Sequence, residues 1–299
     1  MLWVPMNPRQ SHLMLIQIGY DIEFDLPSSA DALFALSVHP SRKSALLQPE
    51  CLRIDPFVPF ISFTDGFGNI CGRAHLPQGR VRFTNDTIIE DSGRPDPVNL
   101  HARQWKVTDL PVETLQFLLA SRYCEVDSEL SEVAWNLFDS VNEGWSRVQA
   151  ICDFVHGHLK FDYQQARSTR TALDAYREKV GVCRDFMHLA VTFCRCMNIP
   201  ARYAMGYLGD IYVAPKPPMD FSAWFEVFLE DRWWTFDARN NERRVGRVLM
   251  ATGRDAADVA MTTIFGKNQL TEFHVRTDEL KEEESHLQRE NLLCEIGAC

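Results

Sequence analysis

Cys183 is the residue of this sequence best placed to do chemistry. It follows Gly181 and Val182 and stands at the expected start of a strongly amphipathic helix. Unpaired N–H groups and the dipole at a helix N-terminus favour a thiolate over a thiol, which is what a nucleophilic cysteine needs. The alternative is a buried, inert cysteine, the usual fate of a free thiol.

An acidic residue, Asp185, lies in the first turn of the same helix. Its carboxylate can accept hydrogen bonds from the N-terminal amides and complements the helix dipole. The same negative charge raises the pKa of a neighbouring thiol. We therefore expect Asp185 to lie at the edge of any substrate cleft around Cys183.

Helices and then strands must position this helix start. Apolar residues recur at spacings of three and four from Trp145 to Leu159, which predicts a helix with one apolar face. Further helices are expected at about 128–139 and 172–179, and the helix from Cys183 ends before Pro200. Strands are expected at 202–208, 223–229 and 232–238. Helices followed by strands in one segment indicate an α+β domain.

The first hundred residues are expected to be β-rich. From Ile16 to Leu26 the side chains alternate strictly between apolar and polar, which is typical of a strand with one buried face. Further strands are expected at 32–38, 60–63, 70–75 and 81–90. We predict an antiparallel sandwich or barrel over residues 11–103, which ends in the polar, proline-containing segment 91–103.

Composition narrows the class of protein. The chain has 299 residues with 31 Lys and Arg against 41 Asp and Glu, a net charge of −10. An acidic chain without a block of basic residues is a poor nucleic-acid ligand. It has no apolar run long enough to span a membrane and no signal-peptide pattern at its start. Nine cysteines without framework spacing fit reduced thiols, so we expect a cytoplasmic protein.

Two smaller clusters have simple explanations. Cys194 and Cys196 are spaced C-x-C on an apolar helix, so we expect them to pack in the core rather than to bind metal. Without a second Cys/His pair at ligand spacing we predict no zinc site, and nothing points to a cofactor. Arg243, Arg244 and Arg247 form a short basic cluster, for which we expect a solvated loop rather than a phosphate site.

Three separated segments carry a family resemblance. They are GVCRDF…NIPARYAMGY (within 181–207), DFSAWFEV (220–227) and WWTFDA (233–238). In order and spacing they resemble the bacterial transglutaminase-like superfamily, whose signature is G-V-C-x-D-F, I-P-A-R-Y-x-x-G-Y, D-F-H-A-W-x-E-V and W-W-x-F-D-A. The resemblance implies a papain-like α+β core over residues 104–276, followed by a charged tail at 277–299. Many bacterial members carry a β domain in front of this core.

The resemblance also implies a Cys-His-Asp triad that attacks an amide carbonyl. Cys183 matches the nucleophile, Asp237 matches the aspartate that orients the imidazole, and Trp224 matches an aromatic residue that helps to shape the substrate channel. The histidine position, however, holds Ser222. A hydroxyl cannot carry a proton as a cation near neutral pH, so general acid–base help worth about 10²–10⁴ in rate is lost.

Other histidines are weak substitutes. His188 lies five residues after Cys183 and therefore about 140° around the helix. His156 and His158 stand near the end of the preceding helix, where we expect structural or solvated roles. His274 lies in the strand-like segment TEFHVR, and the sequence leaves undecided whether this segment returns to the cleft.

The sequence leaves more than one function open. The first is amide acyl transfer by Cys183, as a peptidase, amidase or transamidase of reduced or altered activity. The second is a non-catalytic protein that binds a peptide or protein in the same cleft. A purely structural role has no positive support beyond the charged tail. The expected partner is a peptide or protein amide, with neither nucleic acid nor a membrane.

Overall fold

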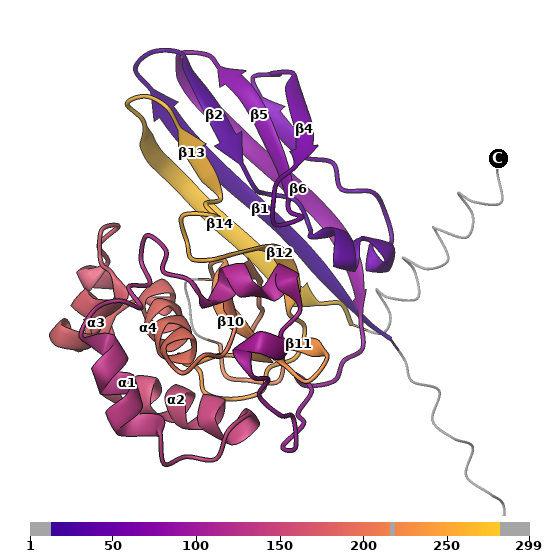
Figure 1. The fold of residues 1–299 in the computed structure, drawn as a ribbon. Helices are drawn as coiled ribbons and strands as arrows, with labels where there is room; N and C mark the ends of the chain where they lie inside the picture. The colour runs from indigo at the N-terminus through magenta and orange to yellow at the C-terminus, as the bar shows by residue number, and fades with distance from the viewer. Residues whose placement is uncertain (1–12, 216–218, 282–299) are drawn as a thin grey trace, which may run out of the picture.

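The computed structural model describes residues 13–215 and 219–281, in a β-sandwich that stands on an α+β unit (Figure 1). The sandwich has two antiparallel sheets of four strands, in the orders β14-β1-β6-β3 and β13-β2-β5-β4. These strands are β1 (Met14–Leu26), β2 (Ala30–Phe34), β3 (Arg53–Asp55), β4 (Phe60–Thr64), β5 (Ile70–Leu76), β6 (Gly79–Asp91), β13 (Thr262–Ile264) and β14 (Gln269–Glu279).

The two sheets pack face to face through aromatic side chains. Phe34 of β2 meets Phe83 of β6 with ring centroids 5.4 Å apart, and Phe24 of β1 also contacts Phe83. The alternating apolar residues of β1 are buried, as the sequence predicts. The prediction of an N-terminal antiparallel sandwich is therefore confirmed.

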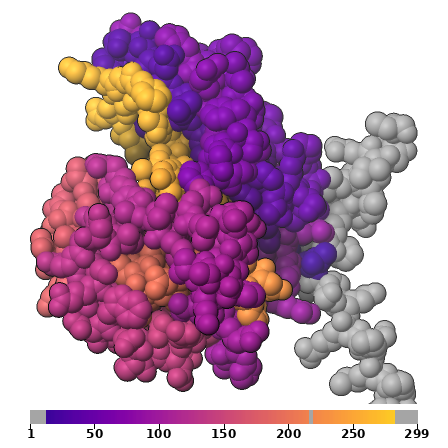
Figure 2. Space-filling model, in the orientation of Figure 1, coloured from indigo at the N-terminus to yellow at the C-terminus, as the bar shows by residue number. Residues whose placement is uncertain are grey.

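The last strands correct the expected boundary at residue 276. β14 pairs along the length of β1, from Ile16 opposite Glu279 to Asp25 opposite Gln269, and β13 pairs with β2. Residues 262–279 thus complete the N-terminal sheets, and the yellow C-terminal strands lie beside the indigo ones (Figure 2). The sequence of β14 does not indicate that it pairs with β1, because few of its side chains are buried and its apolar–polar alternation is weak. The rest of the predicted charged tail, from residue 282, lies outside the described residues.

The α+β unit packs its helices on one face of a central antiparallel sheet, in the order β11-β10-β9-β12. Its helices are α1 (Leu130–Phe138), α2 (Trp145–His158), α3 (Ala172–Glu178) and α4 (Cys183–Cys196), with 3-10 helices at 107–109, 112–118 and 163–165. A further 3-10 helix, at 40–45, lies between β2 and β3 of the sandwich. Its sheet strands are β9 (Ala201–Tyr207), β10 (Ser222–Leu229), β11 (Arg232–Phe236) and β12 (Val248–Gly253), and β7 (Lys160–Phe161) pairs with β8 (Val180–Gly181).

Helix α4 is the centre of this unit, because it packs against β9, β10 and the other helices. Almost all of its residues are buried, including Cys194 and Cys196 as expected for core packing. The α+β class and the four helices agree with the sequence prediction to within about two residues at most ends. Among the described residues no helix has both the length and the apolar character needed to cross a membrane.

Any side chain at Gly206 of β9 is predicted to destabilise the fold. A Cβ at this position would meet the Val248 carbonyl oxygen on β12 and the ring of Trp224 on β10. Gly206→Ala is therefore expected to lower the free energy of unfolding by about 1–3 kcal/mol, measured by urea denaturation. Gly66→Ala is the matched control, because a Cβ there meets nothing within 4 Å. If the two variants were equally stable, the close packing of Gly206 against Val248 and Trp224 would be contradicted.

Candidate functional site

The start of α4 is built by a glycine and a buried carboxylate. Asp185 is fully buried, and its Oδ2 accepts a hydrogen bond from the Val182 N–H at 2.9 Å. The same oxygen forms an ion pair with Arg170 at 3.1 Å, and a Cβ on Gly181 would press on the Asp185 side chain. Asp185 therefore caps α4, as its position predicts. Because no part of it is exposed, the expected place of Asp185 in a substrate cleft is corrected.

The thiol of Cys183 stands at the first helical residue of α4 and is partly buried. Burial raises its pKa to about 11, and the negative charges of Asp220 and Asp185 act in the same direction. The positive charge of Arg239 and the Arg184 N–H oppose the rise but do not cancel it. At pH 7 the thiolate fraction is therefore well below that of an ordinary cysteine.

Ser222 is the first residue of β10, opposite Gly206 of β9. It lines a cavity of about 40 Å³ together with Tyr163, Asp220, Arg239 and Asn240, among others. Three of these residues interact electrostatically with the thiol. Asp220 and Arg239 shift the pKa of Cys183, and Cys183 contributes to the raised pKa of Tyr163, for which burial is the largest cause. Ser222 and Cys183 thus share the same charged neighbours.

Asp237 follows β11 and is buried, with hydrogen bonds to both carboxylate oxygens. Oδ1 accepts from the backbone N–H groups of Arg239 and Asn240, and Oδ2 accepts from the Asn240 side chain and from Arg247, both at 2.9 Å. Burial raises the pKa of Asp237, but the charge of Arg247 and these hydrogen bonds outweigh it, so the pKa is lowered. The carboxylate is ionised and fully partnered without an imidazole.

Sequence reasoning did not find Arg247, Asn240, Arg239 or Asp220 as members of this site. Arg239 and Asn240 come directly after the motif that ends at Ala238, and Asp220 is the first residue of the motif that contains Ser222. Only Arg247 stands apart, in the basic cluster. The available signal was therefore adjacency to the motifs.

Trp224 lies elsewhere than predicted. Its neighbours Ala223 and Phe225 belong to the core that includes α4, whereas Trp224 forms a separate cluster with Ala204 and Leu249. Trp224 is 2% exposed, and it lines a cavity that does not include Ser222 or Cys183. The expectation that Trp224 shapes the channel to the thiol is corrected, because strand alternation turns its side chain away from α4.

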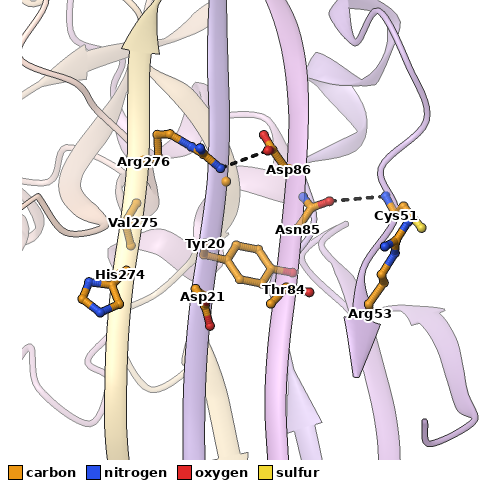
Figure 3. A pocket seen from close by; sticks show the side chains of 11 residues that line it. Tyr20, Asp21, Cys51, Arg53, Thr84, Asn85, Asp86, His274, Val275 and Arg276 are labelled. Atoms are coloured by element: carbon orange, nitrogen blue, oxygen red, sulfur yellow. Dashed lines mark hydrogen bonds and ion pairs between the residues drawn. The ribbon is translucent and has the colours of Figure 1, made fainter. Parts of the chain in front are cut away.

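No histidine of the described segments lines the cavity at Ser222. The ring of His188 is buried, stacks on Tyr123 and accepts a hydrogen bond from the Ala256 N–H at 3.1 Å. His274 lies on β14, in a cavity on the sandwich that also includes the Arg276–Asp86 pair (Figure 3). His156 contacts the Arg239 carbonyl oxygen, and His158 contacts that of Tyr176.

The burial of His188 predicts how the stability of the protein depends on pH. Its pKa lies well below 6.5 because of burial and the charges of Arg184 and Arg195. The unfolded chain takes up this proton near pH 6.5 and the folded chain does not, so stability falls as pH drops below about 6.5, by up to about 1.4 kcal/mol per pH unit. His188→Gln is expected to remove this slope, measured by urea unfolding at pH 7 and pH 5. The exposed His75→Gln is the control, and an unchanged slope in His188→Gln contradicts the prediction.

Known proteins resemble this chain at several levels. A sequence model described as the transglutaminase-like superfamily matches residues 133–238. An uncharacterised protein of Mycobacterium leprae is 36% identical over 192 residues, which cover 62% of this chain and 67% of that protein. An uncharacterised protein of Mycobacterium tuberculosis is 26% identical over 222 residues, or 65% of this chain and 68% of the relative. The crystal structure of a proposed cysteine protease from Cytophaga hutchinsonii matches with a TM-score of 0.79 at 30% identity, over 91% of this chain and 92% of that one.

Proposed function

Because the chain belongs to the transglutaminase-like superfamily, we propose that it is a member that binds a peptide or protein at its thiol site without turning it over through a Cys-His-Asp triad. The site keeps the cysteine and the aspartate of the family motifs. It has a serine at the position that the family gives to histidine. The proposed ligand is a peptide or protein segment with an amide near the start of α4.

One observation carries the proposal: the Asp237 carboxylate is already bound by Arg247 and Asn240, and no imidazole of the described residues lines the cavity at Ser222. Without an imidazole there is no group to take the thiol proton and return it to a leaving amine. The raised pKa of Cys183 agrees with this, since a protonated thiol is a poor nucleophile.

Slow acyl transfer is the second candidate. It is favoured by the Arg239 charge near the thiol and by the hydrogen bond between the Arg184 N–H and Cys183. Both stabilise a thiolate once it forms, and a helix N-terminus adds to them. Such an enzyme would still need water or an amine to resolve the thioester, without general base help.

The test offers the full chain a peptide digest of casein and measures bound peptides and new products by mass spectrometry. We expect saturable binding with no cleaved or cross-linked product. Ser222→Phe, which fills the cavity that Ser222 lines with Asp220 and Arg239, is expected to abolish binding. Ser28→Phe lies on an exposed turn of the sandwich and is the matched control, with folding of both variants checked by circular dichroism.

Three other results of this experiment would contradict the proposal. Product formation that disappears in Cys183→Ala would overturn the proposal in favour of acyl transfer. Binding that survives in Ser222→Phe would place the ligand elsewhere and also overturn it. Absence of both binding and product would exclude this substrate class at the site.

A further inference from the structure

A second cavity, of about 820 Å³, lies on the side of the central sheet to which Trp224 belongs. It is bounded by the end of β6, the segment 92–98 that leaves the sandwich, the 3-10 helix at 40–45 and the loop before β12. Trp224 of β10 and Trp233 of β11 form aromatic parts of its wall. The cavity thus lies where the sandwich meets the α+β unit.

The lining of this cavity is basic, although the chain is acidic. It contains six arginines against three carboxylates, while the whole chain carries a net charge of −10. The arginines are Arg42, Arg94, Arg232, Arg243, Arg244 and Arg247. They come from four separate parts of the sequence, so the fold assembles a positive charge that no single segment carries.

The carboxylates of the lining are already paired. Asp91 binds Arg42 at 3.1 Å, Asp96 binds Arg247 at 2.9 Å, and Glu226 binds Arg202, which does not line the cavity. Within the described residues, no carboxylate lies within 4.0 Å of three of the arginines. These three are Arg94, Arg232 and Arg243.

Two of the arginines are buried, which corrects the expectation of a solvated loop. The side chains of Arg244 and Arg247 are 4% and 7% exposed. Arg244 Nε and Arg247 Nη1 are buried without a hydrogen-bond partner in the structure. Gly246 between them has a φ of 78°, and a Cβ there would press on Ile16 and Ile211, so the loop turns inward at this glycine.

Burying guanidinium groups costs free energy unless negative charge compensates them. The two buried arginines have this compensation, because Arg244 lies 3.6 Å from Asp210 and Arg247 binds both Asp96 and Asp237 at 2.9 Å. The exposed arginines of the lining have no carboxylate partner among the described residues, so the cavity keeps a positive charge that a ligand can meet. The planar fork of a guanidinium matches the two oxygens of a carboxylate or phosphate, and its flat face stacks on aromatic rings. Arg247 already lies 5.1 Å from the ring of Trp224.

Of the three arginines without a carboxylate partner, Arg243 donates to the backbone carbonyl oxygens of Asp96 and Pro95, and Arg232 lies over the ring of Trp234. From the cavity, its excess of arginines over carboxylates and its aromatic wall, we propose a binding site for a small oxyanion with at least two negative charges, of carboxylate or phosphate chemistry. Arg94, Arg232 and Arg243 hold the charged groups, and Trp233 covers the less polar part of the ligand. Because Arg247 also binds Asp237 at 2.9 Å, one guanidinium links this site to the aspartate of the family motif.

The test is calorimetric titration of the full chain with pyrophosphate and, separately, with citrate, at constant ionic strength. We expect saturable binding of at least one probe, and the tighter probe assigns the phosphate or carboxylate source. The double variant Arg94→Gln/Arg243→Gln is expected to bind at least about tenfold more weakly. Both residues are exposed, but Arg243 donates to the backbone carbonyl oxygens of Asp96 and Pro95, so folding of the variant is checked by circular dichroism.

The control removes the same charge elsewhere. Arg73→Gln/Arg80→Gln changes two exposed arginines of the sandwich that do not line the cavity, and it is expected to bind as the natural protein does. Equal weakening in both double variants would mean general charge attraction and would overturn the site. Absence of saturable binding by either probe, with folding confirmed by circular dichroism, would overturn it as well.

Discussion

Ser222→His is expected to make Cys183 react with iodoacetamide at pH 7 about 10²-fold faster than in the natural protein or more. An imidazole beside the thiol forms an ion pair with the thiolate and lowers the pKa of Cys183 from about 11. The rate at Cys183 is read by peptide mass between pH 5 and pH 9. In the natural protein it should rise about tenfold per pH unit throughout, since the thiolate fraction grows by that factor below the pKa.

Ser222→Asn is the control, because it adds a polar side chain of similar reach without a base. Fast alkylation of the natural protein at pH 6 would contradict the raised pKa and would mean that another group activates the thiol. A slow reaction in Ser222→His would mean that position 222 does not face Cys183, and the assignment of the family motif at this position would fail.

Asp185→Ala should cause the largest loss of stability, about 3–5 kcal/mol in the free energy of unfolding. The substitution removes one of the two carboxylates that meet the buried Arg170 guanidinium, Asp185 at 3.1 Å, and leaves only the partly exposed Glu178 at 2.9 Å. It also removes the acceptor for the Val182 N–H. Arg170 is 2% exposed, so water cannot replace the lost partner. Urea denaturation followed by tryptophan fluorescence measures the change.

Glu129→Gln is the matched control for this ion pair. Glu129 binds Arg177 at 2.8 Å, but the two side chains are 48% and 58% exposed. Water screens such a pair, so the control is expected to cost less than about 1 kcal/mol. If Asp185→Ala proved no more costly than Glu129→Gln, burial would not be what makes the Asp185–Arg170 pair important.

Strongly patterned segments of this fold are predictable from sequence, and weakly patterned ones are not. The alternation of β1 and the amphipathic pattern of α4 are strong in the sequence, and both elements appear where expected, although almost all of α4 is buried. Strand β12 is buried on both faces and β14 on almost none, so neither has a period to detect. Their positions depend on β9 and β1, which lie far away in the sequence.

The residues of the candidate site are also predictable from the sequence only in part. The motifs locate Cys183, Ser222 and Asp237, because each stands at an end of a regular element. They cannot tell which donors reach Asp237, since Arg247 arrives from a loop whose direction is set at Gly246. Spacing alone also misjudged Asp185 and Trp224, whose exposure depends on partners from other segments.

The pairing of β14 with β1 has a consequence for synthesis of the chain. Thr271 on β14 donates a hydrogen bond to Glu23 on β1, 248 residues earlier, so β1 is synthesised long before the strand that covers its edge. At about 5–20 residues per second the β1 edge stays open for tens of seconds. An open edge invites pairing with other chains, and such distant contacts slow folding. The nascent chain should therefore depend on chaperone protection until β14 emerges.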